Sequence, residues 1–115
     1  MKLTNAYCLL SAEASESFEN TVTSNVDVPI IKITIANTKI IGRLCVGNKY
    51  GLLVPDTVTE EEWTVLKNSL PEGIKLRKVD EKLSALGNVI SCNDRTALIH
   101  PDLDEETETV IKEVL

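Results

Sequence analysis

The feature that most constrains this sequence is a stretch of residue types that occurs twice. Residues 41–56 contain two apolar runs joined by the polar, glycine-bearing segment 47–51, and the stretch ends at Pro55-Asp56. This pattern predicts two strands joined by a tight turn. The same order of residue types returns at residues 86–102. The sequence therefore predicts an internal repeat, which limits the fold to architectures built from similar packed units.

The repeat has a regular spacing in its central part. Gly42 aligns with Gly87, and Asn48 aligns with Asn93, each at a spacing of 45 residues. Each unit is expected to contain a strand, a turn, a strand, a helix and a closing strand. The unit boundaries are expected near residues 1–41, 42–86 and 87–115, with the first unit short of its opening strand and the third short of its closing strand.

Towards its ends the alignment needs small adjustments. Pro55 aligns with Pro101 at a spacing of 46, which predicts one inserted residue in the second turn. Asn5 aligns with Asn48 at a spacing of 43, which extends the repeat to the start of the chain. No leading strand is expected in the first four residues.

Local signals predict one helix in each unit. Thr59 and Glu62 form a capping-box pattern at the start of the second helix, and Ser15 is the expected N-cap of the first. The third helix is expected from about Asp104. The apolar stripe of the first helix is Ala14, Phe18 and Val22, and that of the second is Trp63, Leu66 and Leu70. Further strands are expected at residues 6–11, 29–35 and 74–79.

Composition narrows the class of protein. The 115 residues suffice for one small domain, and the net charge of −6 disfavours a protein that tracks phosphates. With one Phe, one Trp and two Tyr, the chain has too few aromatic rings for a base-stacking platform. The three cysteines lie in apolar runs, which indicates reduced thiols. We expect no membrane span and no secretory leader, and hence a cytosolic or nuclear protein.

Several longer motifs resemble one known family. They are I-I-G-R-L-C-V-G-N-K-Y-G-L-L-V-P, L-S-A-L-G-N-V-I-S-C-N-D and A-L-I-H-P-D-L-D-E-E-T-E. These motifs are similar to those of the eukaryotic translation initiation factor 6 family, in its N-terminal half, and the similarity runs along essentially the whole chain. The resemblance implies an α+β pentein fold, which is a five-bladed β/α propeller. This chain would hold about two and a half of the five blades.

The resemblance also implies a function. Members of this family are not enzymes in this role and need no cofactor or metal. They bind the intersubunit face of the large (60S) ribosomal subunit near the sarcin–ricin loop, mainly through a ribosomal protein and with little direct contact to nucleic acid. They prevent the small subunit from joining and take part in large-subunit biogenesis. A GTPase and its cofactor protein release them, and they occur in the cytoplasm, nucleus and nucleolus.

Six residues are candidates for partner contact. Arg43 and Asn88 occupy equivalent positions and are expected to project to one face, where the resemblance places the ribosome contact. Each follows a glycine, Gly42 or Gly87, that is expected to interrupt a strand. For these glycines the simpler interpretation is a bulge or a close backbone approach.

The other two candidates, Asn48 and Asn93, head the turns between strands. The simpler interpretation is a left-handed residue or an Asx-turn, in which the side chain satisfies backbone N–H groups. A contact role remains open because both turns are expected on one rim.

Two alternatives remain at this stage. The pentein fold also hosts guanidine-modifying enzymes with a Cys nucleophile, and Cys8, Cys45, Cys92 and His100 supply the residue types. Their apolar contexts favour inert thiols, and His100 is more simply a strand-end residue. The second alternative is a truncated paralogue that assembles with itself, because an incomplete propeller leaves open sheet edges.

Overall fold

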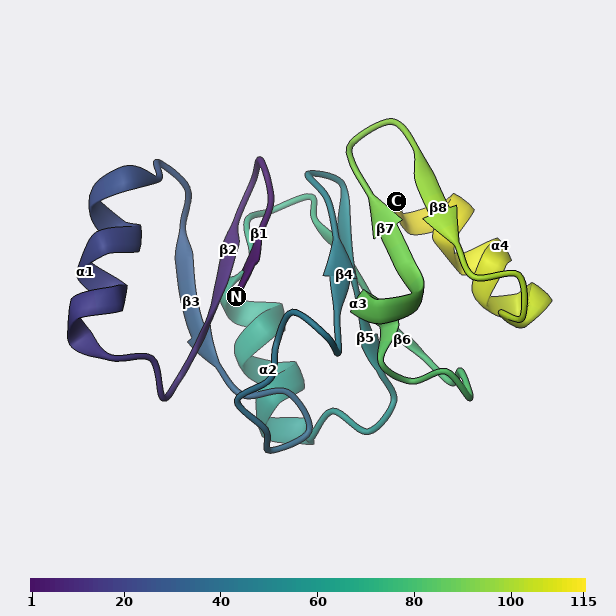
Figure 1. Ribbon diagram of the computed structural model, residues 1–115, viewed down its shortest axis with the longest axis horizontal. Helices are drawn as coiled ribbons and strands as arrows, with labels where there is room; N and C mark the ends of the chain where they lie inside the picture. The colour runs from purple at the N-terminus through teal and green to yellow at the C-terminus, as the bar shows by residue number, and fades with distance from the viewer.

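The computed structural model describes residues 1–115, which form three small sheets placed side by side along the longest axis (Figure 1). The first sheet has the order β1-β2-β3. Its strands are β1 (Lys2–Leu3), β2 (Cys8–Ser11) and β3 (Ile30–Ile33), and helix α1 (Glu16–Asn25) connects β2 to β3. We call these elements the first unit.

The second unit repeats this arrangement. Strands β4 (Val46–Gly47), β5 (Gly51–Pro55) and β6 (Lys75–Val79) form the sheet, and helix α2 (Glu60–Ser69) connects β5 to β6. In both units the first two strands are antiparallel and the third pairs in parallel after its helix. A parallel pair needs such a crossover, so the helix is a required part of each unit.

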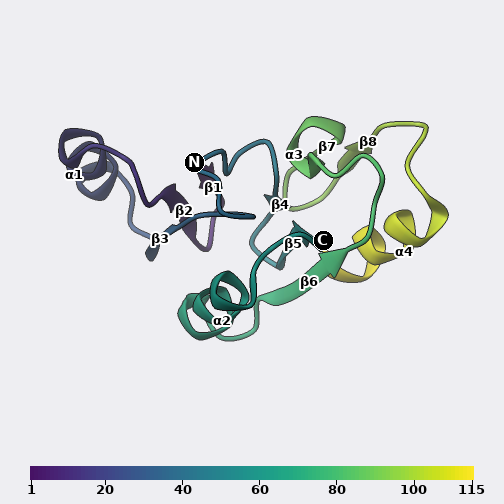
Figure 2. The ribbon, with the colours of Figure 1, turned by 90° about the horizontal axis from the view of Figure 1, so that it is seen from below.

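The third unit has only two strands. A single helical turn, α3 (Leu86–Val89), precedes the antiparallel strands β7 (Ile90–Cys92) and β8 (Ala97–Ile99), and helix α4 (Glu105–Val114) follows. The chain is therefore a mixed α/β structure with three repeated sheets and four helices. In Figure 2, α1 and α4 lie at opposite ends and α2 lies between them.

Strand pairing corrects the alignment of the first unit. The pairs Leu3–Cys8, Gly47–Leu52 and Cys92–Ala97 close the three turns, and each encloses four residues. The residues that head the turns are therefore Thr4, Asn48 and Asn93. The prediction that Asn5 corresponds to Asn48 was wrong by one residue, because a threonine hydroxyl takes the place of the asparagine carbonyl. Thr4 Oγ1 accepts hydrogen bonds from the N–H groups of Ala6 and Tyr7.

The predicted insertion in the second turn was also wrong. The N-cap residues Ser15, Thr59 and Asp104 keep the spacings of 44 and 45 residues that the turns show. Pro55 therefore corresponds to His100, not to Pro101. Pro55 is the last residue of β5, whereas Pro101 lies two residues after the end of β8, so the two prolines differ by one position in their units.

Other differences are local. Residues 42–44 form a turn and α3 a helical turn, so the predicted first strand of each hairpin is shorter than its apolar run. A two-residue strand, β1, does occur at the start of the chain, where none was expected. In α1, Val22 is buried but Phe18 is 45% exposed, although both belong to the predicted stripe. Among the residues described, none packs over the Phe18 ring as Val22 is packed over within the first unit.

The predicted helix signals are confirmed. Ser15 caps α1 by accepting a hydrogen bond from the N–H of Phe18, and Thr59 and Glu62 form the complete capping box of α2. Leu66 is fully buried beneath α2, while Trp63 and Leu70 pack at the edge of the same cluster. The last helix also buries Ile111 and Val114 as its inner face.

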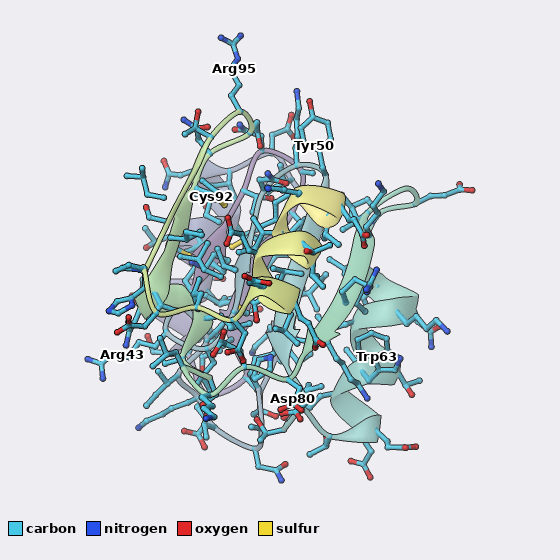
Figure 3. The ribbon with its side chains drawn as sticks, turned by 90° about the vertical axis from the view of Figure 1, so that its right-hand side faces the viewer. Arg43, Tyr50, Trp63, Asp80, Cys92 and Arg95 are labelled. Carbon is cyan, nitrogen blue, oxygen red and sulfur yellow. The ribbon has the colours of Figure 1, made fainter.

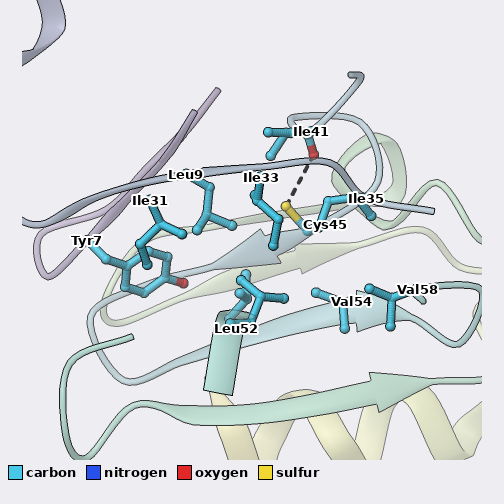
Figure 4. Packing of buried hydrophobic residues seen from close by; sticks show 11 residues of the cluster. Tyr7, Leu9, Ile31, Ile33, Ile35, Ile41, Cys45, Leu52, Val54 and Val58 are labelled. Carbon is cyan, nitrogen blue, oxygen red and sulfur yellow. Dashed lines mark hydrogen bonds between the residues drawn. The ribbon is translucent and has the colours of Figure 1, made fainter. Parts of the chain in front are cut away.

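The core lies between the units. One cluster joins the first and second units through residues such as Leu9, Ile33, Leu52 and Val54 (Figure 4). A second cluster joins the second and third units through Leu53 and residues of α3, β7 and α4. Because side chains alternate along a strand, Leu52 and Leu53 point to opposite clusters. Each sheet therefore has a front face towards the preceding unit and a back face towards the following one.

Candidate functional site

The two glycines of the predicted site lie against each other. The N–H of Gly87 donates a hydrogen bond to the carbonyl of Arg43 at 2.9 Å. A Cβ atom at Gly87 would lie 2.0 Å from the carbonyl oxygen of Gly42, and only a glycine permits that approach. The prediction of a close backbone approach is confirmed at Gly87. The glycines lie in helical turns, however, and not in strand bulges.

Arg43 and Asn88 follow these stacked glycines and are both exposed. They come from equivalent turns of the second and third units, and Figure 3 shows Arg43 projecting away from the ribbon. Arg43 forms no side-chain hydrogen bond or ion pair within the chain. Its guanidinium is therefore free to donate forked hydrogen bonds to a carboxylate or to carbonyl groups of a partner.

Asn48 and Asn93 form the predicted Asx-turns. Asn48 Oδ1 accepts hydrogen bonds from the N–H groups of Tyr50 and Gly51, and Asn93 Oδ1 accepts from those of Arg95 and Thr96. Asn48 is buried, and its Nδ2 donates to the carbonyl of Asn93 at 3.2 Å. Asn48 thus shapes the turns and their stacking, whereas Asn93 is exposed.

The six predicted residues do not form one patch. Arg43 lies at one end of the hairpins, and the tip residues Tyr50 and Arg95 lie at the other (Figure 3). Gly42, Gly87 and Asn88 share the end of Arg43, and Asn48 and Asn93 share the turn tips. The structure therefore offers two separate rims for a partner.

The turn-tip rim contains residues that the sequence analysis missed. The carboxylate of Asp94 accepts hydrogen bonds from the backbone N–H of Lys49 and from Asn5 Nδ2, and so connects all three turns. The hydrogen bond from Lys49 lowers the pKa of Asp94. Lys49 Nζ lies 5.0 Å from the ring centre of Tyr50, which is 49% exposed. A cleft of about 460 Å³ lies beside these turns. The signal available in the sequence was the position of Asp94 directly after a turn-heading asparagine.

The cysteines show no sign of nucleophilic activation. Burial raises the pKa of Cys8 and Cys92, and it raises that of Cys45 to about 12. Cys45 Sγ instead donates a hydrogen bond to the carbonyl of Ile41 (Figure 4). His100 Nδ1 accepts a hydrogen bond from the N–H of Asp102, in keeping with a strand-end role. Thiols with raised pKa values stay protonated near neutral pH and are poor nucleophiles.

The 115 residues contain neither a cluster of metal-ligating side chains nor a helix that could cross a membrane. No group of three or more His, Cys, Asp or Glu side chains is placed to hold a metal ion. None of the four helices combines the length and apolar character that crossing a membrane requires.

Comparison with known proteins assigns the family. The model of the eIF-6 family matches residues 1–115, which is the full chain. The chain belongs to the eIF-6 family. Eukaryotic translation initiation factor 6-2 of Arabidopsis thaliana is 54% identical over 99% of this chain. Eukaryotic translation initiation factor 6 is 52% identical in Saccharomyces cerevisiae and 51% identical in Drosophila melanogaster, again over 99% of the chain.

This eIF-6 family chain is much shorter than these relatives. The matched part is 47% of the length of each of the three proteins. The chain therefore spans about half the length of the relatives it matches.

Proposed function

We propose that this chain forms part of a ribosome anti-association factor. It binds the intersubunit face of the large ribosomal subunit and keeps the small subunit from joining prematurely. The observation that carries the proposal is the identity of about one half, along nearly the full chain, to proteins named translation initiation factor 6. The three repeated sheets support a further part of the proposal, which is that they are blades of a five-bladed propeller.

The partner surface is a protein surface in this proposal. Arg and Tyr are enriched at protein interfaces, and the two rims expose Arg43 at one end and Tyr50 and Arg95 at the other. A net charge of −6 opposes tight binding to ribosomal RNA, so a basic ribosomal protein near the sarcin–ricin loop is the favoured contact. The factor acts by covering a surface, without catalysis.

Further parts of the proposal concern the cellular cycle. The factor takes part in large-subunit biogenesis in the nucleolus and leaves the subunit in the cytoplasm through a GTPase and its cofactor protein. Family membership supports these steps.

The test is sedimentation with purified ribosomal subunits. We expect the chain to travel with free large subunits and not with joined ribosomes. Arg43→Ala should weaken the association at least about tenfold if its guanidinium makes a charge-assisted contact. Lys67→Ala, on the outer side of α2, is the matched control and should leave binding unchanged. The proposal is wrong if neither this chain nor a version as long as its relatives travels with large subunits.

A further inference from the structure

We propose that the free edge of β6 in the second unit binds an extended acidic segment of a partner protein, which adds to the sheet as a fourth strand. The sheet order β4-β5-β6 leaves one side of β6 without a paired strand. The second unit contacts a neighbouring unit on each of its two faces, so this edge is free in a unit that is otherwise fully packed. Figure 2 shows β6 at the outer margin of the molecule. The proposal does not depend on ribosome binding.

The pairing of β6 with β5 shows which backbone groups face outward. The N–H of Lys75 donates a hydrogen bond to the carbonyl of Tyr50 at 3.0 Å, at the start of the parallel pair. In a parallel pair, alternate residues of a strand bond to the same neighbour, so Arg77 bonds to β5 as Lys75 does. The N–H and C=O groups of Leu76 and Lys78 therefore point away from β5. Backbone groups at such an edge can bind an added strand.

The side chains of β6 favour an acidic partner. Lys75, Arg77 and Lys78 are all exposed, which gives this five-residue strand three cations on a chain with a net charge of −6. The carboxylate of Glu113 lies 3.4 Å from Arg77 and can neutralise only one of them. Lys75 Nζ donates to the backbone carbonyl of Glu113, and Lys78 Nζ lies 4.7 Å from the ring centre of Trp63. These contacts hold the cations beside the strand, where Asp or Glu side chains of an added segment can reach them.

The two sides of the edge differ, and the difference sets the pattern of the added strand. Lys75 and Arg77 lie on the back of the sheet with α4, whereas Leu76 lies on the front, in the cluster beneath α2. A cavity of about 170 Å³ lies between the end of α2 and the start of β6, with Leu70, Ile74 and Leu76 among its walls. Because side chains alternate along a strand, the added segment places acidic side chains at the back and apolar side chains at the front.

A second copy of this chain does not suit the edge. Two copies of β6 paired edge to edge would bring Lys75, Arg77 and Lys78 against the same cations of the other copy. Like charges on neighbouring strands destabilise their pairing, and lysines on an edge strand prevent self-association in this way. The cations therefore keep copies apart and leave the edge to an acidic partner.

The first test measures binding of a designed peptide to the 115-residue chain. The probe is a fluorescent peptide of alternating Glu and Val residues, and its anisotropy should report a dissociation constant on the order of 100 μM at low salt. The same peptide with Lys in place of Glu is the control and should bind at least about tenfold more weakly. A chain that binds neither peptide at up to about 1 mM, or both equally, would overturn the proposal.

A pair of variants separates the backbone edge from its charge. Lys78→Pro and Lys78→Ala remove the same cation, but only proline also removes the outward N–H group, and it breaks no hydrogen bond to β5. Lys78→Pro should bind the Glu-Val peptide at least about tenfold more weakly than Lys78→Ala. Urea denaturation checks that both variants are folded. Equal binding by the two folded variants would contradict strand addition.

Methylated peptides test the same point on the unchanged chain. Only alternate N–H groups of an added strand face β6, so N-methylation should abolish binding at the Val amides or at the Glu amides, but not at both sets. Equal effects of the two methylations would overturn the proposal. The free chain should sediment at the monomer mass of 12.7 kDa. A dimer that Lys78→Pro abolishes would assign the edge to a second copy instead, and would overturn the proposal as well.

Discussion

The two junctions between units use the same chemistry with the roles exchanged. At the first junction, the carboxylate belongs to helix α2: Glu62 accepts hydrogen bonds from the Thr34 hydroxyl and from the N–H groups of Ala36 and Asn37. At the second junction, the carboxylate belongs to the segment after β6. Glu81 accepts from the Thr107 hydroxyl of α4 and from the N–H of Asp104. Both glutamates are 5% exposed.

The difference shows which property the junction needs. Glu62 and Thr107 occupy the same helix position, so a carboxylate and a hydroxyl are interchangeable there if the preceding segment supplies the other group. In each case one buried carboxylate satisfies the N–H groups at a helix start and joins that helix to the preceding unit. The contact is preserved between junctions although the residue types at each position are not.

The largest effect should come from the glycine contact at the second junction. Gly87→Ala places a Cβ atom 2.0 Å from a backbone oxygen in the middle of the fold, and it should cost about 3 kcal/mol of unfolding free energy. Gly42→Ala is the counterpart at the first junction. Its Cβ would lie 3.0 Å from the carbonyl oxygen of Met1, the first residue, so it should cost less than about 1 kcal/mol. Urea denaturation measures the unfolding free energy of both variants. Equal losses of unfolding free energy would contradict the expected difference between the two junctions.

The carboxylates should matter equally at the two junctions. Glu62→Gln and Glu81→Gln each replace an acceptor-only group with an amide that points N–H groups at N–H groups. Each should cost about 2 kcal/mol of unfolding free energy. The exposed neighbours Glu61 and Asp80 provide controls. Glu61→Gln and Asp80→Asn should each change the unfolding free energy by less than about 0.5 kcal/mol. A large loss of unfolding free energy for only one of the two variants would show that the two carboxylates do not stabilise their junctions equally.

Acid should weaken both junctions together. Burial raises the pKa of Glu62 and Glu81, but the hydrogen bonds they accept outweigh it, so both pKa values lie below the ordinary 4.5. A carboxyl group whose pKa is lower in the folded chain than in the unfolded chain stabilises the fold when it is ionised. This stabilisation is complete at pH values above the unfolded-state pKa, and it is lost as the pH falls through the folded-state pKa. We expect the unfolding free energy to drop between about pH 5 and pH 3. The double variant Glu62→Gln/Glu81→Gln should show a flatter pH profile, and a profile as steep as the wild type would refute this assignment.

The smallest expected effect is a gain in unfolding free energy, and it is expected at the first junction only. Ala36 and Asn37 adopt φ angles of 53° and 59° in the turn that Glu62 binds, and no residue near the second junction does so. The left-handed region costs an alanine about 1 kcal/mol, which glycine avoids. Ala36→Gly should therefore raise the unfolding free energy by about 0.5 kcal/mol, net of the greater freedom of glycine in the unfolded chain. A decrease would show that the turn is not strained.

Local sequence signals were sufficient for the elements and for much of the repeat. Thr59 and Glu62 lie three residues apart, so their capping box is visible without a structure. The turns at Asn48 and Asn93 are equally local, and their Asx-turns were predicted. The alignment failed where the structure replaced one residue type with another of similar chemistry, as Thr4 does for asparagine.

Contacts between units were not predictable in the same way. Glu81 lies near Asp104, 23 residues later, and nothing in its own neighbourhood distinguishes it from a solvent-exposed acid. Asp94 and Asn5 are 89 residues apart. The site was therefore predicted as single residues in equivalent positions. The separation into two rims, and the role of Asp94 in connecting three turns, depend on how the units stack.

The capping box of α2 has a consequence for how the chain folds. The same Glu62 carboxylate that satisfies the Thr59 N–H at the start of α2 also binds the backbone of Ala36 and Asn37 in the segment after β3. The helix start and that turn therefore cannot open independently, since each leaves the other with unpaired buried groups. Neighbouring units should lose their structure cooperatively, with the amide hydrogens of residues 36, 37 and 59 exchanging at one common rate.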